Sequence, residues 1–447
     1  MSTIDAESIK QEILAKVRDY FKQAHEHKVF VPFQTKIPYA GRVFDAEEIV
    51  NLADAALEFW LTLGRFGQEL ERKLKTFFDA RDALLVNSGS SANLLALGTL
   101  CSPHLDGHLN PGDEVITPAV TFPTTLAPIV QHQLIPVFVD SETGTYNVDP
   151  QQVADAISPS TRAIVVPHTL GNPCDLDALI ALAKRHELWL VEDCCDALGS
   201  TFDGRRVGSF GDLATLSCYP AHQMTMGEGG AVIVNRQRFI RLARSIRDWG
   251  RDCWCAPGVS DTCGKRFGWQ LGELPLGYDH KYIYSHLGYN LRPTDLQAAV
   301  GCAQFEKLDR FIEQRRRNFR RLREGLAALE EFLIFPSVHP KADPAWFGFP
   351  ITLRNGTQRS ALVQWLEAAK IETRMIFAGN ILRQPAMAGV RHRVHGQLRV
   401  TDKVMTDGLF LGVYPGLSDA MIDFVIERVT SFFQALRVGR SAMAAAT

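Results

Sequence analysis

The sequence lacks the long apolar segments that would place it in a membrane or carry it across one. It has no stretch of about 18 consecutive apolar residues, so we expect no transmembrane helix. Residues 1–20 are charged and amphipathic and contain no apolar signal core. The formal net charge is only -2, which excludes a strong overall field toward nucleic acid or membrane surfaces. The sequence therefore predicts a cytoplasmic globular protein with neither kind of partner.

Support for a disulfide framework is also lacking. The nine cysteines are an odd number in a chain of 447 residues without a secretion signal, and cytoplasmic thiols stay reduced. There is no internal repeat, and low complexity is confined to residues 444–446. The composition, 46% apolar and 22% charged, is ordinary for a globular protein, and the chain is long enough for two domains.

Short apolar runs bounded by turn residues recur through the middle of the chain. Most are separated by helical patterns, such as residues 91–100 and 176–186. Strands that alternate with helices predict an α/β fold with a mainly parallel sheet covered on both faces. No full helix fits between the last two runs, so one strand there is expected to be antiparallel. The expected strands are residues 83–86, 114–117, 136–140, 163–167, 188–192, 213–217 and 231–234.

The C-terminal third predicts a smaller α/β domain. Residues 295–326 form a helical pattern, and we interpret its arginines, Arg315 to Arg317 with Arg320 and Arg321, as a solvated face. Further elements are expected at residues 349–353, 360–369, 372–376 and 419–436. We expect three parts: a helical segment (1–65), a large cofactor-binding domain (66–310) with a cysteine loop at 250–265, and a small C-terminal domain (311–447).

Residues 87–93 follow a strand and open a helix. Free backbone N–H groups and the helix dipole around Gly89 favour a phosphate, and the hydroxyls of Ser90 and Ser91 can donate to it. A serine-rich helix cap without a ligand explains the same residues.

Three further residues follow expected strands. Phe122 suits stacking on a flat heteroaromatic ring, although a lone Phe is more often part of a core. Asp193 ends an apolar strand, where a buried carboxylate needs a cation. A protonated pyridine nitrogen is one such cation, and a helix cap is the alternative. His168 either lines the same pocket or is a structural histidine.

Ser217 and His222 lie between two strand-like runs, before a Gly-Glu-Gly-Gly segment. The order of phosphate loop, aromatic residue, strand-end aspartate, Ser217 and His222 resembles the DegT/DnrJ/EryC1/StrS family of sugar aminotransferases, from about Ile37 to the C-terminus. The resemblance implies the aspartate-aminotransferase fold (PLP fold type I), with a mixed, mostly parallel seven-stranded sheet and a smaller C-terminal α/β domain. It also implies pyridoxal phosphate or pyridoxamine phosphate (PMP) as cofactor.

Residues 288–297 resemble the family segment Gly-Tyr-Asn-x-Arg. Its asparagine, here Asn290, reaches the cofactor phosphate of the neighbouring subunit, which implies a homodimer with shared active sites. His222 stands where the family has the lysine that binds the cofactor covalently. An imidazole can transfer a proton but cannot form that bond. A histidine at this position resembles the sugar 3-dehydratases, which hold PMP non-covalently; an aminotransferase that has lost its activity is the alternative.

Four cysteines are spaced like metal ligands. Cys253, Cys255 and Cys263 lie in one loop, and 57 residues separate Cys195 from Cys253. Four thiolates can hold a [2Fe–2S] or [4Fe–4S] cluster, and a zinc site, a disulfide or coincidence are the alternatives. The spacing resembles that of [2Fe–2S] members of the 3-dehydratases, which implies these four as ligands. Cys194 competes with Cys195, and because adjacent strand residues face opposite sides, only one of the two should ligate. The remaining cysteines are interpreted as packing residues: Cys101, Cys174, Cys218 and Cys302.

These resemblances imply removal of the C3 hydroxyl of a nucleotide-linked 4-keto-6-deoxy sugar, with CDP as the expected nucleotide, in 3,6-dideoxyhexose and O-antigen biosynthesis. His222 would act as the base and Asp193 would pair with the cofactor's ring nitrogen. Electrons would come from an NAD(P)H-dependent iron–sulfur flavin reductase or a ferredoxin. A dTDP-4-keto-2,6-dideoxy-sugar 3-dehydratase and a non-catalytic iron–sulfur or zinc scaffold are the alternatives. Residues 374–385 are expected either to bind the nucleotide-sugar or to form an ordinary surface loop.

Overall fold

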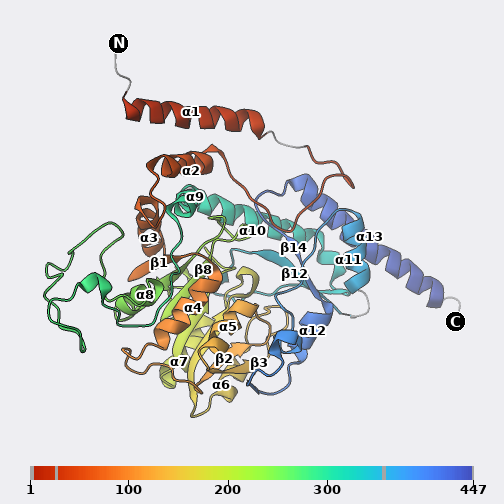
Figure 1. Ribbon diagram of the computed structural model, residues 1–447. Coiled ribbons are helices and arrows are strands. Elements are labelled where there is room, and N and C mark those ends of the chain that lie inside the picture. The colour runs from red at the N-terminus through yellow and green to blue at the C-terminus, as the bar shows by residue number, and fades with distance from the viewer. Residues whose placement is uncertain (1–4, 26–28, 355–358, 445–447) are drawn as a thin grey trace.

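The computed structural model describes residues 5–25, 29–354 and 359–444, and an eight-stranded sheet lies at its centre (Figure 1). The strand order is β1-β9-β8-β5-β4-β2-β3-β13. β9 pairs antiparallel with β1 and β8, and the other neighbours are parallel. The strands are β1 (Asp82–Val86), β2 (Glu114–Pro118), β3 (Ile135–Val139), β4 (Thr161–Pro167), β5 (Trp189–Asp193), β8 (Leu213–Ser217), β9 (Gly230–Val234) and β13 (Arg393–Val394).

The mixed, mostly parallel sheet confirms the expectation from sequence, and so does the antiparallel strand β9. The sheet has eight strands rather than seven, because residues 393–394 add the two-residue strand β13 beside β3. The inner strands are buried on both faces, which explains why continuous apolar runs marked them in the sequence.

Helices cover both faces of the large sheet. α4, α5 and α8 pack on one face, and α3, α6, α7 and α9 pack on the other, each face through its own apolar clusters. The helices are α3 (Arg65–Phe77), α4 (Gly89–Leu100), α5 (Pro123–Gln131), α6 (Pro150–Ala156), α7 (Leu176–Arg185), α8 (Phe239–Arg247) and α9 (Asp295–Phe305).

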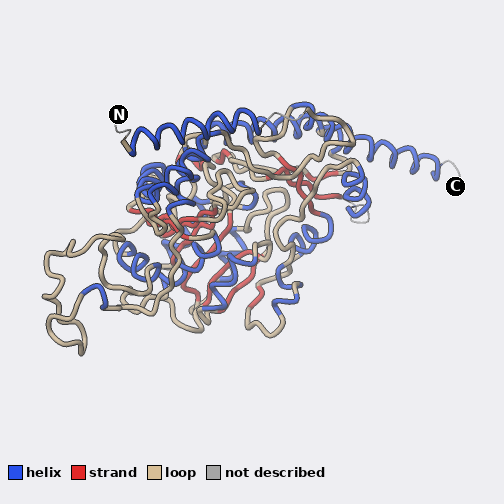
Figure 2. Tube along the Cα trace, turned by 45° about the horizontal axis from the view of Figure 1, so that its top comes forward, coloured by secondary structure: helices blue, strands red, loops and turns tan. Residues whose placement is uncertain are grey.

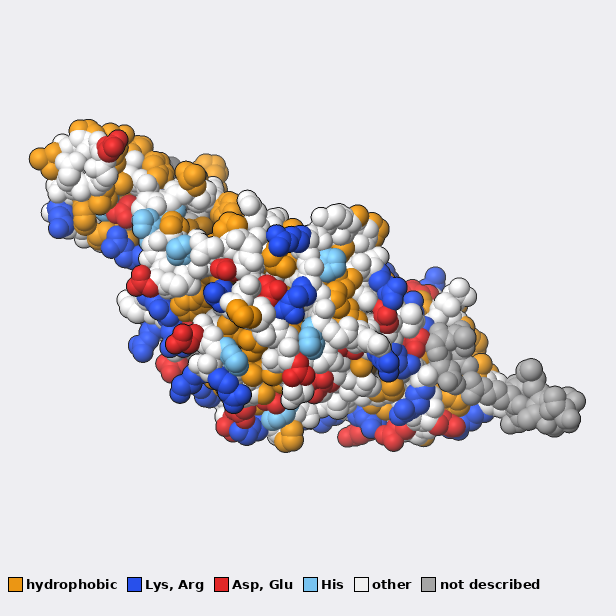
Figure 3. Space-filling model, turned by 90° about the horizontal axis from the view of Figure 1, so that it is seen from below, with side chains coloured by type: hydrophobic (Ala, Val, Ile, Leu, Met, Phe, Trp, Pro, Cys, Tyr) orange, Lys and Arg blue, Asp and Glu red, His pale blue; other side chains and the backbone are white. Residues whose placement is uncertain are grey.

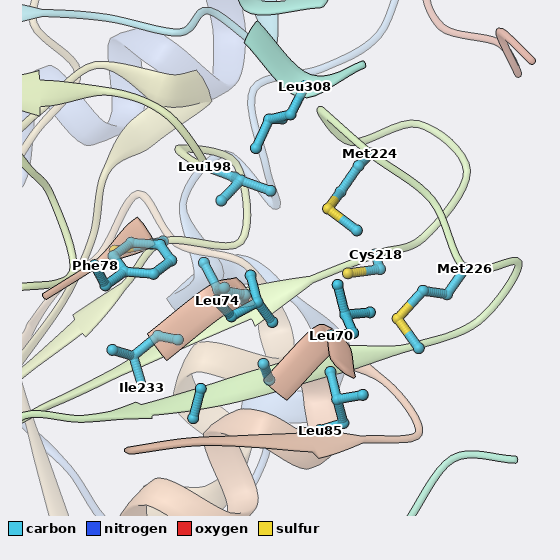
Figure 4. Packing of buried hydrophobic residues seen from close by; sticks show 14 of the residues in the cluster. Leu70, Leu74, Phe78, Leu85, Leu198, Cys218, Met224, Met226, Ile233 and Leu308 are labelled. Atoms are coloured by element: carbon cyan, nitrogen blue, oxygen red, sulfur yellow. The ribbon is translucent and has the colours of Figure 1, made fainter. Parts of the chain in front are cut away.

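One of these clusters anchors the segment that follows β8. Cys218, Met224 and Met226 point toward Leu70 and Leu74 of α3 (Figure 4). Burial raises the pKa of the Cys218 thiol to about 12, so this thiol stays protonated at neutral pH. The expected packing role is confirmed for the fully buried Cys174, Cys218 and Cys302, whereas Cys101 is half-buried.

The C-terminal part forms a three-stranded sheet, β10-β12-β14, against α10, α11 and α13. The helical pattern expected at residues 295–326 is confirmed, and it comprises two helices, α9 and α10, separated by a turn at residues 306–307. Residues 372–376 form no strand, and only Arg374 makes an isolated bridge, to Phe410. These elements are β10 (Leu333–Ile334), β12 (Gly348–Leu353), β14 (Gly408–Gly412), α10 (Leu308–Gly325), α11 (Arg359–Ala368), α12 (Arg399–Asp407) and α13 (Asp419–Ala444). A small third sheet comprises β11 (Ala342–Asp343), β6 (Thr201–Phe202) and β7 (Arg205–Arg206).

Two segments extend away from this body. α1 (Ala6–Ala24) lies along α2 (Ala46–Glu58) at the top of Figure 1. Residues 251–284, which we call the projecting loop, extend to the left in Figures 1 and 2. Bridges between Arg251 and Tyr284 and between Asp248 and Asn290 close its base. In the part of the chain that the structure describes, no helix is long and apolar enough to span a membrane.

Candidate active site

A cavity of about 380 Å³ opens at the carboxyl ends of the central strands. Parallel strands of an open sheet bring their carboxyl ends to one edge, which is where ligands bind in such folds. The cavity brings together most of the residues expected from the sequence: Gly89, Ser90, Phe122, His168, Asp193, Cys195, Ser217 and His222. Ser91 and Asn290 do not line it, and neither does any cysteine of the projecting loop.

The first turn of α4 forms one end of the cavity. Ser88, which the sequence analysis passed over, caps the helix by accepting the N–H of Ser91 at 3.1 Å. The Ser91 hydroxyl donates to Asn87 at 2.6 Å, so Ser91 serves the cap, whereas Ser90 faces the cavity. A Cβ on Gly89 would lie only 2.5 Å from the Cβ of Ser217, so this close approach needs glycine. Backbone N–H groups and hydroxyls are thus presented together, as an anion requires.

Asp193 lies deep in the cavity, and only 5% of it is exposed. Its Oδ2 accepts hydrogen bonds from Asn93 at 2.9 Å and Thr125 at 2.7 Å, and its Oδ1 from the Cys195 N–H at 3.1 Å and Thr215 at 3.3 Å. All four donors are neutral, and within the described ranges no Lys, Arg or His forms an ion pair with this carboxylate. A buried carboxylate held in this way is well suited to a cationic ligand.

His168 contributes to the cavity wall, yet both of its ring nitrogens are already bonded. Nδ1 accepts the Cys174 N–H at 3.0 Å, and Nε2 lies 3.1 Å from Glu192 Oε2. Burial would raise the pKa of Glu192, but the bonds from His168, Gly208 and Gly211 hold it below its usual value. His168 therefore has the structural role that the sequence left open, and it also lines the cavity.

Cys194 and Cys195 follow the end of β5 and face different sides, although neither lies in the strand itself. Cys194 is fully buried in the core, where a Cβ on Gly208 would lie 3.2 Å from its sulfur. Cys195 lines the cavity, and a Cβ on Gly89 would lie 3.0 Å from its sulfur. Burial, with Asp193 beside it, raises the pKa of the Cys195 thiol. Of the two, Cys195 is thus the thiol at the end of the cavity formed by α4.

His222 is oriented by Asp196, a residue that the sequence analysis missed. The imidazole Nε2 lies 3.2 Å from Asp196 Oδ1, while the ring packs against Phe347 with 5.2 Å between centroids. Nδ1 of His222 is buried and has no hydrogen-bond partner among the described residues. The Asp196 carboxylate therefore lies beside the Nε2 edge of the ring, which lines the cavity.

Arg315 corrects the interpretation of its arginine run as a solvated face. Only 1% of it is exposed, and its guanidinium donates to the carbonyls of Ala221, His222, Trp346 and Phe347 at 2.8–3.3 Å. Burial lowers its pKa to about 10, so it remains charged at neutral pH. Arg317, Arg320 and Arg321 do lie on the outside, in surface ion pairs. Nothing within the arginine run itself marks one of its members as facing inward.

The far wall of the cavity comes from Tyr39 and the C-terminal part. Arg374, Met375 and Phe377 line it, and Arg374 is the only Lys or Arg among the lining residues. The remainder of the segment expected to bind a nucleotide-sugar does not reach the cavity. Arg383 instead forms an ion pair with Asp402 at 2.6 Å, so only the start of residues 374–385 lies at the cavity.

The projecting loop carries the other three expected metal ligands. Cys253 and Cys255 line a separate hollow of about 100 Å³, beside Arg247. The Thr262 N–H lies 3.4 Å from Cys255 Sγ, and Cys263 Sγ lies 3.8 Å from Nδ1 of His280. In the described chain, the one group of three His, Cys, Asp or Glu ligand atoms within 4.8 Å of one another is His168, Glu192 and Cys194. A single chain therefore does not gather the four expected ligands into a compact tetrahedral site.

The fold and this cavity define the class: the chain has the fold of the pyridoxal-phosphate-dependent aminotransferases. It belongs to the DegT/DnrJ/EryC1/StrS aminotransferase family, whose sequence profile matches residues 43–430.

Individual relatives extend this likeness over almost the whole chain. The lipopolysaccharide biosynthesis protein RfbH of Salmonella typhimurium is 50% identical over 431 residues, which are 96% of this chain and 99% of that one. The dTDP-4-dehydro-2,6-dideoxy-D-glucose 3-dehydratase of Saccharopolyspora spinosa is 52% identical over 426 residues, 95% of this chain and 92% of that one. The solved structure of E. coli GDP-4-keto-6-deoxy-D-mannose-3-dehydratase with bound hydrated PLP superposes with a TM-score of 0.80. It is 28% identical, over 88% of this chain and 99% of that one.

Proposed function

We propose that this protein is a PMP-dependent 3-dehydrase that removes the C3 hydroxyl of a nucleotide-linked 4-keto-6-deoxyhexose, in deoxysugar and lipopolysaccharide biosynthesis. The observation that carries the proposal is His222, which cannot bind a cofactor covalently yet lines the cavity with its imidazole oriented by Asp196. The names of the relatives at 50% and 52% identity, in lipopolysaccharide biosynthesis and in 3-dehydration, support it.

The residues of the cavity fit PMP. We assign the phosphate to the first turn of α4, at Gly89 and Ser90, and the ring to the space beside Phe122. The Asp193 carboxylate, buried among neutral donors, would hold the ring nitrogen in its protonated form. Bound there, PMP would supply a primary amine for the 4-keto group and an electron sink.

His222 would perform the proton transfer. Its Nε2 lies 3.2 Å from Asp196, whose negative charge would stabilise the ring when it becomes positively charged. The imidazole would then accept a proton from the cofactor's C4′ carbon, a step that must precede departure of the C3 hydroxyl. Phe347 packs against the ring and keeps it from rotating away.

We also assign the nucleotide-sugar to the far wall. Arg374 provides a positive charge there, and Tyr39 lies beneath its guanidinium at 4.1 Å. Relatives in the family carry dTDP or GDP in their names, so the nucleotide varies among similar chains. We propose CDP, with dTDP as the alternative.

A [2Fe–2S] cluster held by Cys195, Cys253, Cys255 and Cys263 completes the proposal. The chemistry of the loop fits such a group. Burial opposes ionisation of Cys255, but hydrogen bonds from Thr262 outweigh burial and leave the pKa of Cys255 below its usual value, whereas burial raises the pKa of Cys253. A cluster would pass electrons one at a time from a partner reductase or ferredoxin to the dehydrated sugar.

The test is anaerobic incubation of the purified protein with PMP, a one-electron reductant and either CDP- or dTDP-4-keto-6-deoxyglucose, with mass spectrometry of the sugar. The proposal expects a 3-deoxy product from one of the two nucleotides. Formation of an amino sugar, or no turnover of either substrate by cluster-loaded protein, would contradict it.

A further inference from the structure

The thiol that lies in the cavity has no thiol partner there. Cys195 Sγ is beside Gly89, at the end of the cavity formed by α4. No other cysteine is among the residues that line this cavity. If Cys195 is a cluster ligand, the other ligands must come from residues that do not line this cavity within a single chain.

The other three thiols lie on a segment that leaves the body of its own chain. Figures 1 and 2 show the projecting loop extending away from the central sheet. Cys253 and Cys255, at its base, line the separate hollow beside α8. Cys263 lies farther along the loop, against His280. The geometry of one chain thus separates the fourth ligand from the other three.

The projecting loop and its base have an apolar surface. Large apolar side chains there are widely exposed: Phe267 to 60%, Leu276 to 75% and Leu287 to 101%. Orange apolar side chains are visible on the lobe at the left of Figure 3, where the loop lies. An apolar surface of this extent is normally covered in the functional assembly.

Asn290 indicates what covers it. This residue is exposed, lies outside the cavity of its own chain, and is joined to the base of the loop through the bridge to Asp248. The resemblance to the family assigns Asn290 to the phosphate end of a second subunit's cavity. A loop tied to Asn290 would arrive at that same end, and Cys195 of the second copy lies there beside Gly89.

We propose that the cluster is assembled across the subunit interface, with Cys195 from one protomer and Cys253, Cys255 and Cys263 from the other. The proposal rests on the proposed function, since it presupposes the cluster. A second copy of this chain would then cover the apolar surface of the loop, and cluster binding would require dimerisation.

Mixed dimers test this arrangement. Cys195→Ser and Cys253→Ser chains with different affinity tags are co-expressed, the heterodimer is isolated by two affinity steps, and iron and acid-labile sulfide are measured after anaerobic reconstitution. If the cluster lies across the interface, one of the two sites has all four cysteines. Its Cys195 comes from the Cys253→Ser chain, and its three loop cysteines come from the Cys195→Ser chain. The heterodimer should then hold about half of the wild-type iron, with the visible absorption of a [2Fe–2S] cluster, while each homodimeric variant holds little.

The other outcomes are equally distinct. If all ligands came from one chain, each site of the heterodimer would lack one cysteine, and iron at the level of the homodimeric variants would overturn the proposal. Full iron in the Cys195→Ser homodimer would overturn it too and would point to a set within the loop, with His280 as the fourth ligand. If reconstituted wild-type protein held neither iron nor sulfide, the protein would bind no cluster, and the iron–sulfur part of the proposed function would be wrong. This result is distinct from one in which a cluster forms within a single chain. Cys101→Ser is the matched control, and it should keep the wild-type iron.

Discussion

The guanidinium of Arg315 donates a hydrogen bond of 2.8 Å to the main-chain carbonyl of His222. A second bond joins the same Nη2 to the carbonyl of Ala221, and Nη1 holds the carbonyls of Trp346 and Phe347. One buried cation therefore ties the backbone that carries the proposed base to the backbone that carries the aromatic ring packed against it. The position of the imidazole depends on α10 as well as on its own loop.

Replacing Arg315 should damage both stability and the site. Arg315→Met leaves four buried carbonyls without their donor, and the expected loss is about 3 kcal/mol in the free energy of unfolding. Urea titration measures it. Arg320→Met is the control on the same helix, because the exposed Arg320–Glu313 pair should contribute no more than about 1 kcal/mol. Equal losses for the two variants would contradict the role assigned to Arg315.

Asp196→Asn should slow proton transfer without preventing cofactor binding. The amide keeps the size of the side chain but cannot stabilise a positively charged imidazole, so we expect exchange of the cofactor's C4′ hydrogen with deuterated solvent, in the presence of the 4-keto nucleotide-sugar, to fall by about 10²-fold. Proton NMR of bound PMP measures the rate. Asp177→Asn, at an exposed surface ion pair with Lys341, should exchange at the wild-type rate. Wild-type exchange in Asp196→Asn would show that the carboxylate does not orient His222.

His222→Lys should restore covalent capture of the cofactor. A lysine at this position would react with the aldehyde of pyridoxal phosphate, and borohydride should fix the product to the peptide that contains residue 222. Peptide mass spectrometry locates it. Wild-type protein treated in the same way should carry no label on that peptide. A variant that folds but remains unlabelled there would mean that residue 222 does not occupy the lysine position.

Glu192→Gln should destabilise the protein in a pH-dependent way. The folded state holds the pKa of Glu192 below its usual value, so the carboxylate stabilises the fold above the unfolded-state pKa of about 4.3 and loses this contribution as the pH falls through the folded value. The difference in unfolding free energy from wild type, about 3 kcal/mol near pH 7, should therefore shrink below about pH 4. Exposed Glu324→Gln should show almost no difference at either pH. A pH-independent difference would exclude this charge effect.

The sequence sufficed where local chemistry decides the structure. The buried strands are continuous apolar runs between turn residues, so their positions were predictable to within one or two residues. The expectation that Cys194 and Cys195 face different sides is met, although both follow β5 rather than lie in it. The order of the glycine-serine turn, the strand-end Asp193 and His222 placed the cavity at the correct edge of the sheet.

The features that were missed depend on contacts between distant parts of the chain. Arg315 is buried because the carbonyls of residues 221, 222, 346 and 347 converge on one face of α10, which no pattern within the helix reveals. Asp196 pairs with a residue 26 positions later, on a loop anchored by α3. The break between α9 and α10 falls at residues with ordinary helix propensity, where Lys307 is tied to Glu48 of α2.

Oxygen exchange tests the central claim, cleavage of the C3–O bond, most directly. Wild-type protein is incubated with PMP and the 4-keto nucleotide-sugar in H₂¹⁸O without a reductant, and the sugar is analysed by mass spectrometry. The 4-keto oxygen exchanges with water by itself, so an enzyme-free sample sets the baseline of one ¹⁸O. We predict a second ¹⁸O at C3 with the wild type, because elimination without reduction is reversible, and only the baseline with His222→Asn. A C3 oxygen that remains ¹⁶O in the presence of cofactor-loaded wild-type protein would contradict the account.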